Sequence, residues 1–195
     1  MFTYDSVAVL GADLRRGRCA AAIEPVRGRI AVLPGRCEPI EKYAETAADL
    51  AARGFDVMVA EWRAHGLSGG RRADNPQKHH LDDFSLLTDD LETMLGDGNG
   101  GPPRLLLAHS MGALVATLHL ARHPRRYAAA ALVAPMFGVN VAPWPKDVAR
   151  MIAHAAVRMG LGEFYAFSQG DYDPAERVFD AANRLTSDPA RYAVL

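Results

Sequence analysis

Short, continuous runs of apolar residues recur along the chain at intervals that suit a buried sheet. Four runs have glycine or proline in or near their ends: Arg29–Gly35, Asp56–Trp62, Arg104–Ser110 and Ala128–Met136. Continuous apolarity is typical of strands buried on both faces, as in a parallel sheet, whereas a strand with one wet face alternates. The runs therefore predict four buried parallel strands.

The segments between these runs carry apolar residues at helical spacing. They are Ile40, Tyr43, Ala44, Ala47 and Ala51, then Phe84, Leu87, Leu91, Met94 and Leu95, then Met111, Leu114, Val115 and Leu118. Alternating strands and helices predict the α/β class, with a doubly wound, mostly parallel sheet. The segment Ser6–Val26 has a weaker pattern, from which we expect an antiparallel hairpin at the sheet edge.

The pattern changes beyond Pro135. Val148–Met159 is typical of an amphipathic helix, and helix starts are predicted at Asp173-Pro174-Ala175-Glu176 and Ser187-Asp188-Pro189. The chain therefore divides into an α/β core over residues 1–140 and a smaller helical region over 141–195.

Composition narrows the range of functions. The 195 residues are 49% hydrophobic and 23% charged, with a net charge of −1, which excludes wholesale disorder and a basic nucleic-acid surface. Cys19 and Cys37 are too few for a disulfide framework, and from the acidic start and the interrupted apolar segments we expect neither a signal peptide nor a membrane span. We expect a cytoplasmic protein with no membrane span, and peripheral membrane contact stays open.

The pentapeptide Ala108-His109-Ser110-Met111-Gly112 lies where a strand should turn into a helix. This is the context of a nucleophile elbow, in which small residues two before and two after the serine allow a sharp turn. The helix beginning at Met111 would direct its amides toward an oxyanion. The alternative for Ser110 is a plain helix N-cap.

A second candidate lies after the first strong strand, in the loop Pro34-Gly35-Arg36-Cys37-Glu38. Acyl transfer requires another N–H donor for the oxyanion, and hydrolases of this architecture supply it from a neighbouring loop. The donors would be the backbone amides of Arg36 and Met111. The alternative is an ordinary turn between a strand and a helix.

The loop Trp62–Gly69, together with this elbow and the loop after Leu33, resembles the serine lysophospholipase and monoacylglycerol lipase type of α/β-hydrolase. The segments Pro34–Tyr43, His80–Phe84 and Leu185–Tyr192, with Asp90, are similar to its bacterial lysophospholipase branch. The resemblance implies an esterase in which Ser110 attacks a lipid acyl ester, with Ala108, His109 and Gly112 supporting the elbow and no cofactor. It also implies that residues 141–195 form part of a helical cap.

The resemblance also implies an acid and a histidine after Ser110, and none is found in suitable order or context. We expect His109 to be structural, His119 and His123 to lie on the surface, and His65 to belong to its loop. The alternative function is therefore a catalytically incomplete fragment, truncated within the cap, with Ala128–Met136 as an exposed apolar edge. A thioesterase or haloperoxidase-like hydrolase is less favoured because of the loop motifs.

We expect no metal and no dinucleotide cofactor. His79 and His80 are adjacent, so their side chains should point apart, and Cys37 has no indicated partner except Arg36, whose charge should lower the thiol pKa. The glycine-rich segment Gly96–Gly101 follows a helix, whereas a dinucleotide loop must follow a strand.

Overall fold

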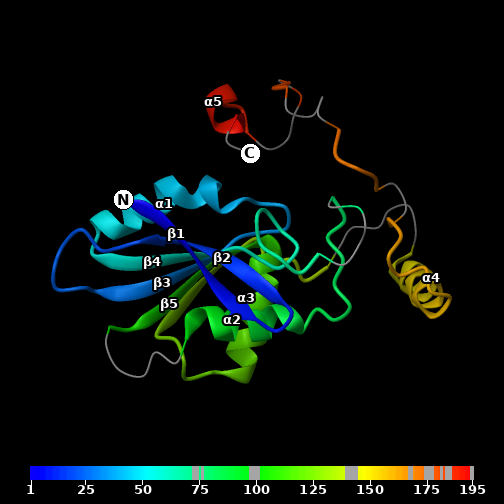
Figure 1. The fold of residues 1–195 in the computed structure, drawn as a ribbon, viewed down its shortest axis with the longest axis horizontal. Coiled ribbons are helices and arrows are strands. Elements are labelled where there is room, and N and C mark those ends of the chain that lie inside the picture. Colours follow the sequence, from blue (N-terminus) through cyan, green and yellow to red (C-terminus); the bar gives the residue numbers. More distant parts are fainter. Residues whose placement is uncertain are drawn as a thin grey trace.

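A six-stranded mixed sheet forms the centre of the molecule (Figure 1). The computed structural model describes residues 1–71, 75, 77–96, 102–138, 145–166, 169–173, 178–180, 182 and 186–193. The strands are β1 (Phe2–Val9), β2 (Ala12–Cys19), β3 (Gly28–Leu33), β4 (Phe55–Ala60), β5 (Arg104–His109) and β6 (Ala129–Val133). Their order across the sheet is β1-β2-β4-β3-β5-β6.

The sheet has a parallel part and an antiparallel edge. The four predicted strands are confirmed as β3 to β6 and pair in parallel, with Ile30 opposite Val57 on one side and Leu105 on the other. The hairpin β1–β2 is antiparallel and joins β4 at one edge. The hairpin covers Phe2 to Cys19, so it begins and ends earlier than the predicted segment Ser6–Val26.

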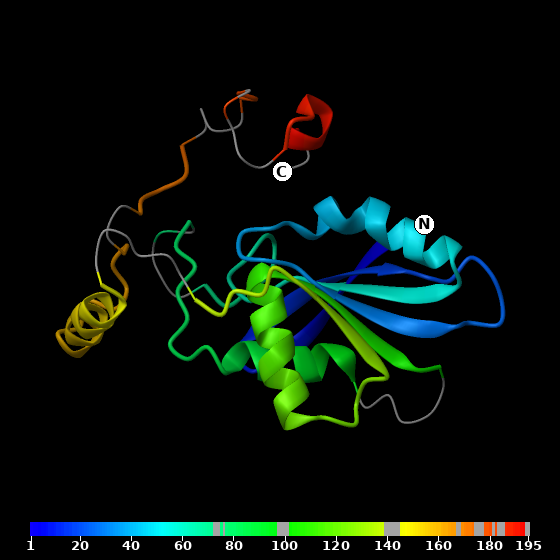
Figure 2. The same cartoon turned by 180° about the vertical axis from the view of Figure 1, so that it is seen from behind.

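Helices cover both faces of the sheet, as Figures 1 and 2 show. A 3₁₀ turn η1 (Ile40–Tyr43) leads into α1 (Ala44–Ala52) on one face, and α2 (Leu86–Leu95) and α3 (Ser110–Arg122) lie on the other. Alternate residues of β3 serve opposite sides: Ile30 and Val32 pack with α1, whereas Ala31 and Leu33 pack with α2 and α3. Burial on both faces explains why β3 is continuously apolar.

The opposite edge of the sheet is β6, whose five residues are all exposed. The prediction of an apolar edge strand is thereby confirmed, with Leu132 and Val133 among the exposed large side chains. The helix α4 (Lys146–Arg158) matches the predicted amphipathic helix but buries no residue. Short α5 (Pro189–Tyr192) is capped by Asp188, whose carboxylate accepts from the amides of Ala190 and Arg191.

Three sequence predictions concern residues outside the described part of the chain. They are the helix start at 173–176, of which only residue 173 is described, the boundary between core and cap region at residue 140, and the loop 97–101. Among the described residues, no helix combines the length and apolarity that a bilayer crossing requires.

Candidate active site

Ser110 lies at the junction between β5 and α3, with φ at +50°. A left-handed conformation is unfavourable for a residue with a Cβ, and such residues occur where the surrounding structure enforces them, often at functional sites. The Ser110 carbonyl accepts a hydrogen bond of 3.1 Å from the amide of Met136, which ties the turn to the end of β6. The strand-to-helix turn predicted from the pentapeptide is therefore present.

Gly112 allows the first turn of α3 to approach β3 closely. A Cβ on Gly112 would lie 2.3 Å from the carbonyl oxygen of Leu33 and 2.4 Å from that of Pro34. Both neighbours are backbone atoms that cannot rotate away, so no side chain fits here. Ala108, two residues before the serine, is buried in the core.

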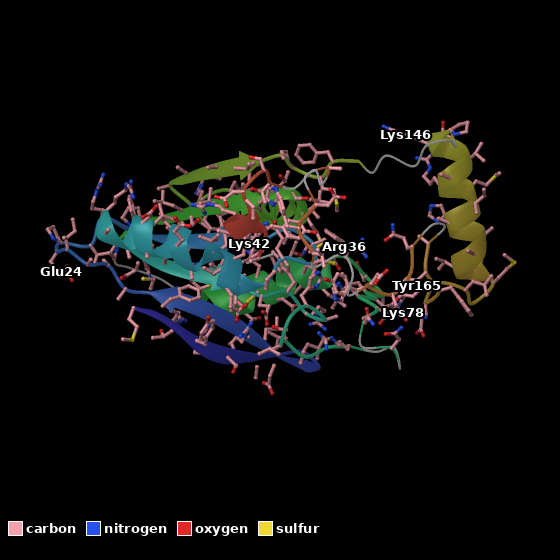
Figure 3. All side chains as sticks on the ribbon, turned by 90° about the horizontal axis from the view of Figure 1, so that it is seen from above. Glu24, Arg36, Lys42, Lys78, Lys146 and Tyr165 are labelled. Atoms are coloured by element: carbon pink, nitrogen blue, oxygen red, sulfur yellow. The ribbon has the colours of Figure 1, made fainter. Side chains whose placement is uncertain are left out.

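The loop after β3 is fixed at the same place. The carbonyl of Pro34 accepts a hydrogen bond of 2.8 Å from the indole Nε1 of buried Trp62, which comes from the loop after β4. The Arg36 side chain is exposed, on the side of the sheet that faces Lys78 and Tyr165 (Figure 3). Backbone amides in the first turn of α3, including that of Met111, have no acceptor within their own helix. The backbone amides of Arg36 and Met111 are the two donors that the sequence predicted for an oxyanion.

Glu38 joins this loop to the elbow, a role that the sequence analysis missed. Its Oε2 accepts hydrogen bonds from the Gly35 amide (2.5 Å) and the Tyr43 hydroxyl (2.6 Å), and Oε2 also lies 3.0 Å from Nδ1 of His109. Its Oε1 accepts from Lys42 at 2.6 Å. The one hint in the sequence was the spacing of four between Glu38 and Lys42, which suits an ion pair.

These contacts determine the ionisation of Glu38. Burial alone would raise the pKa of the carboxyl, but the hydrogen bonds from Lys42, Tyr43, His109 and the Gly35 amide outweigh it and lower the pKa to about 2. The carboxylate is therefore ionised at neutral pH. Through it, His109 takes part in holding the loop, as expected for a structural residue.

The loop after β4 is held by two buried carboxylates. Glu61 accepts from Arg15 at 2.7 Å, from Ser68 at 3.0 Å and from the Leu67 amide at 3.0 Å. Gly66 has φ +47°, and a Cβ there would lie 2.2 Å from Oε1 of Glu61. The Gly-x-Ser ending of this loop thus folds around a buried acid.

Arg63 of the same loop makes a two-pronged ion pair with Asp90 of α2. Nε and Nη2 of Arg63 lie 2.6 Å from the two carboxylate oxygens, and both side chains are buried. A planar guanidinium suits this geometry. The pair fastens the loop to α2.

Among the described residues, no histidine hydrogen-bonds the Ser110 hydroxyl. His109 contacts Glu38, His65 Nδ1 contacts the Arg63 carbonyl at 2.9 Å, and His119 contacts Glu92 and Tyr127. The expectation of a surface position for His119 is wrong: its side chain is fully buried because α3 turns it toward Tyr127 and Glu92.

Comparison with known proteins assigns the family. Residues 24–194 match the model of the serine aminopeptidase S33 family. The chain is 40% identical over 171 residues to lysophospholipase L2 of Escherichia coli, covering 84% of this chain and 48% of that protein. It is 33% identical over 135 residues to the monoacylglycerol lipase of Mycolicibacterium smegmatis, covering 67% of this chain and 46% of that protein.

Solved structures show the same fold at low identity. An epoxide hydrolase variant from Solanum tuberosum superposes with a TM-score of 0.60 at 18% identity, covering 80% of this chain and 46% of that one. An epoxide hydrolase from Vigna radiata superposes with a TM-score of 0.58 at 18% identity, covering 77% of this chain and 46% of that one. The chain spans about half the length of the curated relatives it matches. On the extent of these matches, the chain belongs to the serine aminopeptidase S33 family of α/β-hydrolases.

Proposed function

We propose that this chain carries the nucleophile and the oxyanion-binding groups of a serine ester hydrolase that acts on acyl esters of lipids. The observation that carries the proposal is the left-handed turn at Ser110, enforced where Gly112 meets the backbone of β3. Such a turn presents a serine hydroxyl away from its strand and helix.

In the proposed reaction, Ser110 Oγ attacks the ester carbonyl carbon, and its hydroxyl proton passes to solvent, which later supplies the proton of the leaving alcohol. The amides of Arg36 and Met111 donate to the oxyanion of the tetrahedral intermediate. The alcohol then leaves with a proton, and water hydrolyses the acyl-serine to release the acid and restore Ser110. Support for the Arg36 amide comes from the contacts of Glu38 and Trp62, which fix its loop before substrate arrives.

Ala108, His109 and Gly112 would act as supports of the elbow rather than as reacting groups. His109 lies 3.0 Å from Glu38, which in turn holds the Gly35 amide. Preorganised donors stabilise a transition state because they need no reorganisation during the reaction.

The lipid ester class is supported by the names of the relatives, a lysophospholipase and a monoacylglycerol lipase. The chain covers 48% of the first of these proteins and 46% of the second.

A second candidate is a chain that is acylated at Ser110 but does not turn over by itself. It is favoured by the histidines described above, whose nitrogens contact groups other than the Ser110 hydroxyl. Removing the base of such a site costs several orders of magnitude in rate, although nucleophile and oxyanion donors persist.

Fluorophosphonate labelling and hydrolysis of p-nitrophenyl esters distinguish a hydrolase that turns over from a chain that is only acylated at Ser110. Labelling and steady turnover that both vanish in Ser110→Ala support the hydrolase, with Ser6→Ala on exposed β1 as the matched control. Labelling with at most one equivalent of released p-nitrophenol supports the second candidate. Folded protein that shows neither would contradict both.

A further inference from the structure

Three potential metal ligands meet beside the loop that follows β3. Cys37 lies in that loop, His65 in the loop after β4, and His79 in the segment before α2. One ligand atom from each lies within 4.8 Å of the other two. Three separate loops therefore bring a thiol and two imidazoles to one point.

The distances suit a small tetrahedral ion. Cys37 Sγ and His79 Nδ1 are 3.3 Å apart. Zinc bonds of about 2.3 Å to sulfur and about 2.0 Å to nitrogen place such ligand atoms roughly 3.3–3.6 Å apart. His65 lies beside this pair: one of its ring nitrogens is within 4.8 Å of the other two ligand atoms, and its ring lies against that of His79 with centroids 4.2 Å apart.

His65 is oriented as a ligand. Its Nδ1 lies 2.9 Å from the Arg63 carbonyl, an acceptor, so the proton is on Nδ1 and Nε2 carries a lone pair. That Nε2 atom is buried and lacks a hydrogen-bond partner within the described structure, and the residue is only 3% exposed. A buried acceptor without a partner is costly, and a backbone carbonyl on the other nitrogen is the usual outer contact of a metal-bound histidine.

We propose that Cys37, His65 and His79 form a binding site for one Zn²⁺ or a similar thiophilic transition-metal ion, with a fourth position open to solvent. Thiolate and imidazole favour such ions over Mg²⁺ and Ca²⁺, which take oxygen ligands. The charges of Arg36 and Arg71 lie near enough to His79 to act on it, so ligand bonding has to outweigh their repulsion.

The ionisation of the ligands agrees with this site. Burial, with the neighbouring His65 and Arg36, lowers the pKa of His79 to about 4, and burial lowers that of His65, so both rings are neutral at pH 7. Burial raises the pKa of the Cys37 thiol and outweighs the charge of Arg36, contrary to the sequence expectation. A metal-bound cysteine is a thiolate, so binding releases the thiol proton to the buffer.

The adjacency of His79 and His80 argued against a metal site in the sequence. Their side chains do diverge, since His80 faces Asp82 at 3.4 Å, while His79 meets Cys37. The other two ligands, Cys37 and His65, lie 42 and 14 residues before His79 in the sequence. Because Cys37 follows Arg36, a bound ion would also brace the loop proposed to hold the oxyanion; the site itself does not depend on that function.

The test is titration of the 195-residue chain with Co²⁺, followed by competition with Zn²⁺. We expect one Co²⁺ per chain, with a thiolate-to-cobalt charge-transfer band and tetrahedral d–d bands, both displaced by Zn²⁺. Cys37→Ser should abolish the charge-transfer band. His79→Gln should weaken binding by more than the about 10–100-fold typical of losing an outer contact.

His80→Gln is the matched control, being adjacent and without a place in the site, and it should keep the affinity within about twofold. Circular dichroism checks that each variant folds, and calorimetry in two buffers counts the released proton. The proposal is overturned if folded wild-type protein binds no Co²⁺. It is equally overturned if Cys37→Ser and His79→Gln bind as the wild type does, or if His80→Gln is as damaging as His79→Gln, which would indicate adventitious binding.

Discussion

The part of the molecule up to residue 138 and the described residues from 145 onward differ in how they use apolar side chains. All the described buried residues lie in the first region, from Leu14 to His119. In the second, α4 exposes Met151, Ile152 and Val157, and Figures 1 and 2 show it apart from the sheet. Both regions have helical patterns, but among the described residues only those of the first bury apolar side chains.

The buried core and the candidate active site lie in the same region of the chain, the one up to residue 138. Apolar pattern alone predicts a helix, whereas burial requires a second surface to pack against. The elbow, the loop after β3 and the loop after β4 all belong to the region with a core. The following substitutions test this division by pairing a position in a packed environment with a matched exposed one.

The largest effect should come from Gly112→Ala. The added Cβ would overlap the backbone carbonyls of Leu33, at the end of β3, and of Pro34, so we expect a loss of more than about 4 kcal/mol in unfolding free energy. Gly138→Ala is the control, because nothing lies within 4 Å of its Cβ position. Urea unfolding followed by circular dichroism measures both, and equal stabilities would contradict the close approach at the elbow.

A pair of isoleucines compares the regions directly. Ile40, the first residue of η1, is fully buried against the sheet, and its substitution by alanine should lower the unfolding free energy by about 3–4 kcal/mol because a cavity remains. Ile152 on α4 is 50% exposed, and its alanine variant should stay within about 0.5 kcal/mol of wild type. If Ile152→Ala proved as costly as Ile40→Ala, α4 would have to be packed in solution.

Two ion pairs make the same comparison for charge. Asp90→Asn leaves the Arg63 guanidinium buried without its counter-ion, and we expect the free energy of unfolding to fall by about 3 kcal/mol. Asp147→Asn removes the partner of Arg150 in an exposed pair on α4 and should change stability by less than about 0.5 kcal/mol. Thermal unfolding distinguishes the two, and a neutral Asp90→Asn would refute the anchoring of the loop by α2.

A smaller effect is expected from pH through Glu38. Since its folded pKa is about 2, below the ordinary value of 4.5, its contribution is fully present above pH 4.5 and is lost as the pH falls toward 2. The contribution is of the order of 1–3 kcal/mol. Unfolding free energies measured between pH 2 and pH 6 should fall less steeply in Glu38→Gln, and an unchanged slope would contradict the contacts of this carboxylate.

Much of the first region was predictable from sequence. Continuous apolar runs identified β3 to β6. Both faces of β3 and β4 are buried, which explains their apolar runs, whereas β6 is apolar although its residues are exposed. Small residues around Ser110 identified the turn. The capped start at Asp188 was predictable because its contacts are local.

What the sequence did not indicate depends on contacts between distant loops. Glu38 meets His109 across 71 residues, and Cys37 meets His79 across 42, so no local spacing marks either pair. His119 was misplaced because its burial depends on Tyr127 and Glu92, which lie outside its own helical stripe. Side-chain partners of this kind follow from topology rather than from periodicity.

The most direct test of the central claim is to map where a fluorophosphonate reacts. The folded chain is labelled, digested and analysed by mass spectrometry, alongside the same chain in urea and alongside Ser110→Ala. We expect an adduct on Ser110 in the folded chain only, because the left-handed elbow and the proposed oxyanion donors require the folded chain. Adducts spread equally over exposed serines such as Ser6, or none on Ser110 in the folded chain, would contradict it.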